Sequence, residues 1–530
     1  MGLIGCTSSN NDVSGNSFSF FDRFENASSE ETSLNNYLAL NQTWWKNYND
    51  PATDQLVAQL IQQNLQLQAA GERLIQAREQ VNISRAGFFP TLSADTGASR
   101  QAGPLNGLPG GGTVYQTNFD LGVSAAWQLD LFGEIRNQIA ADRASYLASV
   151  ANRDALVQSL IVQLMQTRIG LATLSKQQEL IEQTIASREK TREIVERRYE
   201  LGADGVSALD VRLARENLAS VQSQLPSIES NIKENTYALD LLLGLMPNAA
   251  DQDTDYSFIE LAPPPERLTI PPPVALLDTR PDLRSNELLL TAANRGIDVA
   301  VAQLYPSVSI GGGYGFQAED LGDLISADSI AWNLLANITQ PLFEGGRLRA
   351  NVRLQESRAR ELAADYAQSI LTAVQEVENA LQREENARKQ LTQLEKTETE
   401  ASEAYKLAES RYQRGILNLT ELLDIERRLL SQRQQILDVQ QAIWNARLAL
   451  HLALGGAWFD ETPSPVKPTP AVTTETNEVQ SKTIEEVVEA PVTETIETTE
   501  PTRPPTFAPR QVRPDNIHNN ARRVSNKIDL

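Results

Sequence analysis

Two long stretches without proline place the strongest constraint on how this chain can fold. No proline occurs from Ile135 to Arg198 or from Arg347 to Arg411, and Gly170 is the only glycine in either stretch. About 65 helical residues, each rising roughly 1.5 Å, make a rod on the order of 100 Å long, which is too long for a compact domain. Shorter helical patterns follow, from Ser207 to Leu243 and from Leu419 to Leu454. We therefore expect each rod to fold back on itself as a helical hairpin.

Apolar residues recur along both stretches at spacings of three and four, the period of a coiled-coil seam. In the second stretch they are Ile370, Ala373, Val377, Ala380, Ala387, Leu391, Leu394, Ala401, Tyr405, Ala408 and Tyr412. In the first stretch, 213 positions earlier, the matching residues include Leu164, Leu174, Ile181, Val195 and Tyr199. Each rod is therefore expected to pack along one side against other helices.

The chain contains an internal repeat of one sequence pattern. Its motifs recur at nearly constant offsets: Phe89-Pro90 as Tyr305-Pro306, Leu131-Phe132 as Leu342-Phe343, and Arg198-Tyr199-Glu200-Leu201-Gly202 as Arg411-Tyr412-Gln413-Arg414-Gly415. Each half is predicted to contain a helix, two strands, a long helix, a turn and a second helix. The first helices are expected from Asp54 to Arg85 and from Pro281 to Leu304. The repeats are assigned to residues 34–250 and 277–457, joined by a proline-rich linker at 251–276.

The predicted strands alternate apolar and polar residues. In the clearest strand Phe119, Leu121, Val123, Ala125, Trp127 and Leu129 share one face, and similar alternation covers residues 91–100, 308–317 and 332–339. A sandwich sheet with one buried face alternates in the same way, so the pattern leaves a soluble sheet and a membrane sheet open. Four strands are too few to close a membrane barrel, and an open sheet edge is unstable in lipid. If the apolar faces meet lipid, several copies must share one barrel.

The composition argues against several classes of function. The chain has 47 basic and 69 acidic residues, a net charge of −22, so no basic face for nucleic acid is expected. Its single cysteine is Cys6 and its two histidines are His451 and His518, too few for a disulfide or an ordinary metal site. We expect no cofactor, no metal and no enzymatic activity. No apolar run of 18 residues is present, so a membrane-spanning helix is not expected.

The two ends of the chain differ from its middle. Leu3-Ile4-Gly5-Cys6 is similar to the lipobox of bacterial lipoproteins, and a Ser/Asn-rich tether follows; residues 1–33 are assigned to this anchor. A signal peptide would also need a basic and an apolar segment, so we expect the natural chain to begin further upstream. Residues 458–530 are rich in Pro, Thr and Glu without a sustained period, and are expected to form a disordered tail.

The motifs together resemble a known family. Trp44 to Asp50, Arg280-Pro281-Asp282, Gln340 to Arg347 and both Arg-Tyr-x-x-Gly turns resemble, in order and spacing, those of the outer-membrane efflux protein (TolC-like) family, in its lipoprotein branch. The resemblance covers about Leu34 to Gly456. It implies a mixed membrane α/β fold and a homotrimer: four strands per chain in a 12-stranded outer-membrane barrel, and a periplasmic tunnel of helical hairpins. It also implies an adaptor protein and an inner-membrane pump as partners, and a passive, gated conduit for solutes or drugs.

The resemblance also places the periplasmic mouth of the conduit just after the two turns, at Tyr199, Gly202 and Gly415. The gate residues that it implies are Asp210, Tyr412, Glu421 and Asp424. A ring of carboxylates at a narrow point selects for cations. The sequence departs from the family pattern in two ways. Asp210 stands one residue nearer its turn glycine than Asp424 does, and Leu417 replaces a basic residue of some relatives. The alternative interpretation, that these acids are solvated or helix-capping residues, stays open.

Two other functions are compatible with the sequence. The same fold could form the exit duct of a type I protein secretion system. A protein of a different class, a periplasmic coiled-coil structural protein without a channel, would need no barrel and would stay soluble without detergent.

Overall fold

The computed structural model describes residues 24–25, 43–104, 113–203, 205–247, 264 and 270–456. All of them lie in the first of two compact units, Met1–Thr462, and the second unit is Pro463–Leu530. The predicted acylation site Cys6, most of the N-terminal tether and of the proline-rich linker, and the predicted tail lie outside the described residues.

The two halves of the chain share the order helix, two strands, long helix and returning helix, and they differ in how the returning helix and the strand connection are built. The first half contains a short 3-10 helix, helices α2 to α6 and strands β1 and β2: η1 (Trp44–Tyr48), α2 (Pro51–Gln63), α3 (Leu65–Ala86), β1 (Thr91–Pro104), β2 (Thr113–Leu129), α4 (Glu134–Glu200), α5 (Ala208–Gln222) and α6 (Leu225–Leu242). The second half repeats helix, two strands, long helix and returning helix: η2 (Pro273–Ala275), α7 (Leu276–Thr279), α8 (Pro281–Ala302), β3 (Ser307–Ala318), η3 (Leu321–Asp323), η4 (Ala327–Ser329), β4 (Ile330–Thr339), α9 (Arg347–Gln413) and α10 (Leu419–Ala453).

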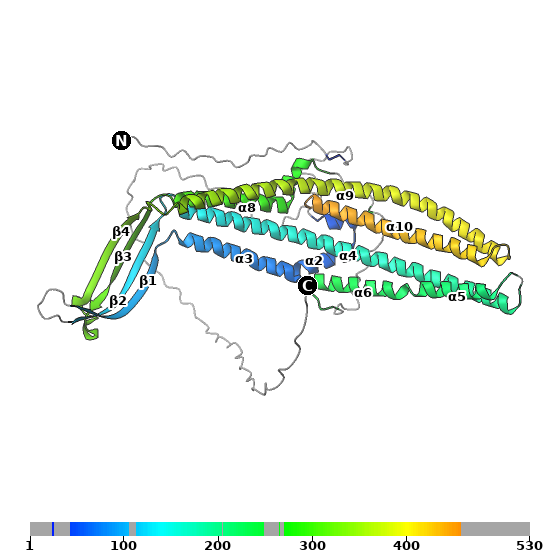
Figure 1. Ribbon diagram of the computed structural model, residues 1–530, viewed down its shortest axis with the longest axis horizontal. Helices are drawn as coiled ribbons and strands as arrows, with labels where there is room; N and C mark the ends of the chain where they lie inside the picture. Colours follow the sequence, from blue (N-terminus) through cyan, green and yellow to red (C-terminus); the bar gives the residue numbers. More distant parts are fainter. Residues whose placement is uncertain are drawn as a thin grey trace, which may run out of the picture. The chain divides into compact units, whose positions relative to one another are not determined.

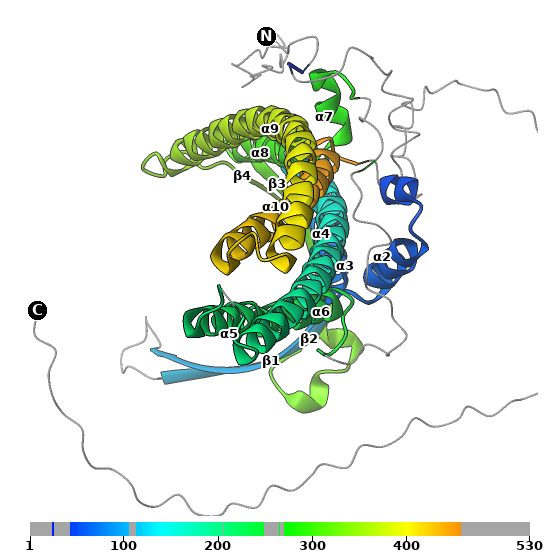
Figure 2. The ribbon, with the colours of Figure 1, turned by 90° about the vertical axis from the view of Figure 1, so that its right-hand side faces the viewer.

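The two predicted rods, α4 and α9, are confirmed as continuous helices of 67 residues each. Each begins directly after a glycine with a left-handed backbone, Gly133 at φ 85° and Gly346 at φ 87°. α10 packs along α9, whereas α4 packs on α3 and α8 at its first half and on α5, α6 and α10 further along (Figures 1 and 2). The predicted seam is largely buried, as Val377, Ile181 and Val195 show with no exposed surface.

Two predicted helices are in fact interrupted. The expected helix from Asp54 to Arg85 breaks at Asn64, whose side chain accepts bonds from the amides of Gln66 and Leu67 and donates to the carbonyl of Leu242 at 2.8 Å. The buried asparagine caps α3 and holds the start of that helix against the end of α6. These hydrogen bonds end α2 at this position, although the helical sequence pattern continues. The expected helix from Ser207 to Leu243 is divided into α5 and α6, and a proline stands in the first turn of α6.

The four strands form one antiparallel sheet in the order β1-β2-β3-β4, with the pair β2–β3 joining the two halves of the chain. β1 and β3 begin directly after Pro90 and Pro306, as predicted, whereas β1 extends to Pro104 and β2 begins at Thr113, both beyond the predicted alternation. The register brings the apolar positions of all four strands to one face: Leu92, Ala94 and Ala98; Phe119, Leu121, Val123, Ala125, Trp127 and Leu129; Val308, Ile310, Tyr314 and Phe316; and Ile330, Trp332, Leu334, Ala336 and Ile338.

The apolar face of the sheet is exposed in the single chain. Leu92 is 80% exposed, Trp332 is 74% exposed and Leu334 is 75% exposed. Among the described residues the buried apolar clusters are built from helices and their flanking segments. Figure 1 shows the sheet beyond the ends of the helices, which leave both of its faces uncovered.

The opposite face of the sheet is polar and rich in glycine. It carries Ser93, Asp95, Ser124, Asp120, Gln128, Ser309, Gln317, Asn333 and Asn337, with Leu335 as an apolar exception. Gly122 and Gly315 are directly paired on this face, and a Cβ atom on Gly315 would lie 2.4 Å from the carbonyl oxygen of Leu121. The two strands therefore approach each other more closely here than side chains would permit.

Candidate functional site

Both long helices end in the same kind of turn. In the first turn the amide of Ala203 donates to the carbonyl of Arg198 at 3.0 Å, and Gly202 has φ 65°. In the second turn the amide of Ile416 donates to the carbonyl of Arg411 at 2.9 Å, and Gly415 has φ 75°. This is the Schellman motif, which needs a left-handed residue and therefore favours glycine. The repeated Arg-Tyr-x-x-Gly motif thus marks the tip of each hairpin.

Asp210 is a helix-capping residue at the first tip. Its carboxylate accepts a hydrogen bond from the amide of Ser207 at 2.8 Å, and the hydroxyl of Ser207 accepts one from the amide of Asp210 at 3.3 Å. At the second tip Asn418 caps α10 by accepting from the amide of Glu421 at 2.8 Å. Asp210 and Glu421 occupy the same position in their helices, so Asp210 corresponds to Glu421 and Leu213 stands at the position of Asp424.

The other two acids lie in the first two turns of α10. Glu421 is exposed, and Asp424 is partly exposed. Asp424 forms ion pairs with Arg427 and, at 2.6 Å, with Arg428. The hydrogen bond from Arg427, together with the charge of Arg428, holds the pKa of Asp424 below its ordinary value. Both carboxylates reach solvent, which an electrostatic filter for cations requires, and that of Asp424 does so while paired with two arginines.

Tyr412 is buried between the two hairpins, at 6% exposure, and burial raises the pKa of its hydroxyl. The guanidinium of Arg198, on the other hairpin, lies 5.3 Å from the centre of the tyrosine ring. It also donates hydrogen bonds to the carbonyls of Tyr412 at 3.2 Å and Gln413 at 2.6 Å. Tyr199, the matching tyrosine, is 47% exposed. The tyrosine of the repeated motif is therefore a buried contact between hairpins in the second turn and a surface residue in the first. Arg198 was part of the motif but not of the predicted gate.

A second link between the hairpins was not predicted. Arg188 on α4 pairs with Glu426 on α10 at 3.3 Å and donates to the carbonyl of Asn217 on α5 at 2.9 Å. The hydroxyl of Ser187 donates to the same carboxylate at 3.2 Å. Burial raises the pKa of Glu426, and the charge of Arg188 opposes this. The sequence held a signal, because Arg188 stands seven residues from both Ile181 and Val195, on the apolar seam itself.

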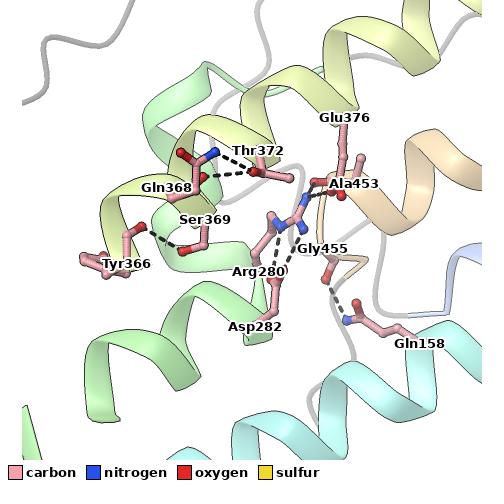
Figure 3. A network of polar contacts seen from close by, with 10 residues as sticks. All are labelled: Gln158, Arg280, Asp282, Tyr366, Gln368, Ser369, Thr372, Glu376, Ala453 and Gly455. Carbon is pink, nitrogen blue, oxygen red and sulfur yellow. Dashed lines mark hydrogen bonds and ion pairs between the residues drawn. The ribbon is translucent and has the colours of Figure 1, made fainter. Parts of the chain in front are cut away.

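The Arg280-Pro281-Asp282 motif forms a joint among three helices, far from the tips (Figure 3). The guanidinium of Arg280 donates to the carboxylates of Asp282 at 2.7 Å and Glu376 at 2.7 Å, and to the carbonyl of Ala453 at 2.9 Å. These bonds connect the start of α8 with α9 and the end of α10, beside a cleft of about 420 Å³. The arrangement is a structural connection, with each nitrogen of the guanidinium donating to a protein acceptor.

The Trp44-to-Asp50 motif packs against the same C-terminal end of α10. Trp44 stacks on His451 with ring centres 4.4 Å apart, and the hydroxyl of Tyr48 lies 2.9 Å from Nε2 of His451. Complete burial lowers the pKa of His451 to about 3, so the ring is neutral. Asp50 forms a buried ion pair with Arg168 on α4. The motif therefore fixes the N-terminal segment to both halves of the chain.

Two further observations concern catalysis and membrane spans. Among the residues that the structure describes, no three His, Cys, Asp or Glu side chains lie where they could hold a metal ion. Within the same part of the chain, no helix is both long enough and apolar enough to cross a bilayer.

Comparison with known proteins gives consistent matches. The family model of outer membrane efflux proteins matches residues 56–245 and 273–456. The chain is 31% identical over 412 residues to a solvent efflux pump outer membrane protein, SrpC, of Pseudomonas putida, covering 78% of this chain and 86% of that protein. It is 28% identical over 421 residues to a probable outer membrane lipoprotein, SilC, of Salmonella typhimurium, covering 79% and 89%.

Solved structures give the same match. The structure of the outer-membrane channel OprN superimposes with a TM-score of 0.76 at 28% identity, covering 84% of this chain and 99% of that one. The structure of CusC superimposes with a TM-score of 0.69 at 28% identity, covering 79% of this chain and 96% of that one.

Proposed function

Because the chain belongs to the outer membrane efflux protein family, a family of channels and not of enzymes, we propose that it is the outer-membrane channel of a tripartite efflux system. It conducts solutes or drugs from a periplasmic adaptor and an inner-membrane pump to the exterior. The pump supplies the energy, so this chain is a passive conduit with a gate.

The observation that carries this function is the uncovered apolar face of the four-stranded sheet. Burying that face in water-free surroundings is favourable by about 25 cal/mol for each Å² of apolar surface, and lipid offers such surroundings. The same sheet has free edges at β1 and β4, which lipid cannot satisfy. Three copies would supply twelve strands, enough to close a barrel without edges. We therefore assign the chain to a homotrimer with its apolar face toward the outer membrane.

The polar face of the sheet then lines the lumen, and the helical hairpins form the periplasmic tunnel. The far ends of the hairpins form the mouth, at which the adaptor and pump would dock. We assign Tyr412 to the contact that holds the mouth shut, with Arg198 as its partner on the other hairpin. Three copies of Glu421 and Asp424 would form an acidic constriction. Asp210, at the matching position of the first hairpin, would add charge while capping α5.

Cys6 would anchor each chain to the membrane through acyl groups, since buried methylene groups hold a lipidated chain end at a bilayer. The test is the mass of the N-terminal peptide from the wild type and from Cys6→Ala. A wild-type peptide without added lipid mass would remove the lipoprotein assignment.

The channel itself is tested by two measurements on the full chain in detergent. A native mass of three chains is expected, whereas a monodisperse protein that needs no detergent would favour the coiled-coil alternative. In planar bilayers the double variant E421Q/D424N should show a raised or reshaped conductance and weaker cation preference. The variant D328N, which removes one exposed acid in η4 far from the tips, serves as the control. Unchanged conductance in E421Q/D424N would place the constriction elsewhere.

A further inference from the structure

Glu426 is a carboxylate buried between the two hairpins, where α10 packs on α4. Its side chain is 9% exposed. Two groups of α4 donate to it, the hydroxyl of Ser187 at 3.2 Å and Nε of Arg188 at 3.3 Å. Arg188 divides its guanidinium, because it also donates to the carbonyl of Asn217 on α5 at 2.9 Å. The carboxylate therefore shares its arginine with a neutral acceptor.

A second buried carboxylate shows a fuller compensation of its charge. The side chain of Glu384 on α9 is 8% exposed, and it accepts two bonds from Arg447, at 2.9 and 2.6 Å. It accepts a third bond from Arg388 at 2.9 Å. Hydrogen bonds between an ionised donor and a carboxylate are typically about 2.7–2.9 Å long, and arginine often binds through two nitrogens. Glu426 is buried to the same extent as Glu384, but it has a single, longer bond from one arginine.

The other charged or titratable groups at this site come from α9 and α10. The charge of Glu409 on α9 acts against that of Glu426 and raises its pKa. Arg433 of α10 borders the same cavity of about 170 Å³, but its guanidinium pairs with Glu398 on α9 at 2.9 Å. Tyr405 of α9 is neutral, since burial raises the pKa of its hydroxyl. The arginine of α4 is therefore the cation that compensates the buried charge.

A short chain of hydroxyl groups allows Glu426 to hold a proton. The hydroxyl of Tyr405 lies 3.2 Å from that of Ser187, which in turn lies 3.2 Å from the carboxylate. With Glu426 ionised, Ser187 donates to the carboxylate and accepts from Tyr405. With Glu426 protonated, the acid can donate to Ser187, which then donates to Tyr405. Both charge states of Glu426 therefore leave the three groups hydrogen-bonded.

The position of Glu426 connects its proton with the contact between the hairpins. With the hairpins in contact, burial outweighs the charge of Arg188 and raises the pKa of Glu426 above its ordinary value. If the hairpins part, water reaches the carboxylate and its pKa falls toward the ordinary value. The hairpins in contact therefore bind the proton more tightly. By linkage, the stabilisation that the proton gives to this contact is present in acid and is lost as the pH rises through the raised pKa.

We propose that Glu426 is the proton-sensitive residue of the gate, which takes up a proton from water when the mouth shuts and releases it when the mouth opens. Acid in the periplasm then favours the shut channel, and neutral pH favours opening. This inference rests on the proposed gate and adds a regulatory group to it, further from the tips than the link between Arg198 and Tyr412.

The test is single-channel recording of the full chain in planar bilayers, with the pH of both compartments lowered from about 8 to about 4, a range that includes the ordinary pKa of glutamate. The open probability of the wild type should fall several-fold over this range. E426Q imitates the protonated group at every pH, so its open probability should be low at neutral pH and should vary little. S187A removes a donor to the carboxylate but keeps the charge pair, so it should move the midpoint of the profile to higher pH.

The matched control is E403Q, which neutralises an exposed acid of α9 that pairs with Lys406 and should keep the profile of the wild type. The conductance of the open channel is read separately, because the acids proposed for the mouth titrate in the same range. Equal profiles for the wild type and E426Q, or a wild type that opens in acid, would overturn the inference and leave the channel intact. A chain that forms no channel in bilayers would overturn the proposed function, and this inference with it.

Discussion

Replacing Arg198 by methionine removes the contacts that join the tips of the two hairpins while keeping the length of the side chain. The guanidinium donates to two carbonyls of the other hairpin, at 3.2 and 2.6 Å, and lies over the ring of Tyr412. Hydrogen bonds from a charged donor contribute about 1.5 kcal/mol or more each, but the bond to Gln413 is exposed and counts for less. A cation–π contact at an exposed site adds about 0.5 kcal/mol. The link as a whole is worth about 2 kcal/mol.

This energy sets the expected size of the effect on the proposed gate. A loss of about 2 kcal/mol from the shut state changes the ratio of shut to open about 30-fold for each link, and the proposed trimer contains one such link in every chain. Single-channel recording in planar bilayers measures that ratio as the open probability. R198M should raise the open probability strongly, and R198K should give an intermediate value because it keeps the charge and loses the forked geometry.

The repeat provides a matched control for this experiment. Arg411 is the same residue of the same motif on the other hairpin, and it is exposed. R411M should therefore leave the open probability near that of the wild type. Equal open probabilities for R198M, R411M and the wild type would refute the assignment of Arg198 and Tyr412 to the gate.

Further predictions concern stability. Burial alone would raise the pKa of Glu384, but the hydrogen bonds and charge of Arg447 outweigh it and hold that pKa below its ordinary value. The stability from this pair is therefore present above the pKa of an unfolded glutamate and lost as the pH falls through the folded pKa. E384Q should cost about 3 kcal/mol at neutral pH, and its thermal midpoint should depend less on acid than that of the wild type; parallel midpoint curves would contradict this. G455A should destabilise the chain far more than G415A, because a Cβ atom on Gly455 would lie 2.5 Å from the carbonyl oxygen of Thr279, whereas Gly415 has no atom within 4 Å. G415A should cost only about 1 kcal/mol of backbone strain, and equal thermal midpoints for the two variants would show that the contact at Gly455 relaxes freely.

The parts of the fold that follow from local pattern were predictable. Proline-free stretches and a sustained seam predicted the two rods within a few residues, because proline disrupts the interior of a helix and neither stretch contains one. Alternation gave the strand faces, since side chains of a strand point to opposite sides in turn. The exposure of the apolar face shows that the described part of the single chain does not cover it, and alternation could not supply that information.

The parts that depend on distant contacts were not predictable. The break at Asn64 is stabilised by the carbonyl of Leu242, far away in sequence, and a polar residue inside a helical pattern gives no hint of it. Asp210 was assigned by the family resemblance, and its different distance from the turn glycine left open which acid of the second hairpin it matches; helix capping aligns it with Glu421. Arg188 and Glu426 lie among apolar neighbours. Each buried charge is stabilised by the other across two helices, and neither sequence segment alone shows that its charged residue has this partner.

The two faces of the sheet differ in side-chain size, and this difference affects how the strands could close into a barrel. Glycines Gly97, Gly122, Gly311, Gly313 and Gly315 all stand on the polar side, while tryptophans, leucines and isoleucines crowd the reverse side. A ribbon with small groups on one side and large groups on the other bends most easily toward the small side. The difference in side-chain size therefore favours a sheet that is concave on its polar side. In the proposed barrel this is the curvature that each chain would have to adopt around the lumen.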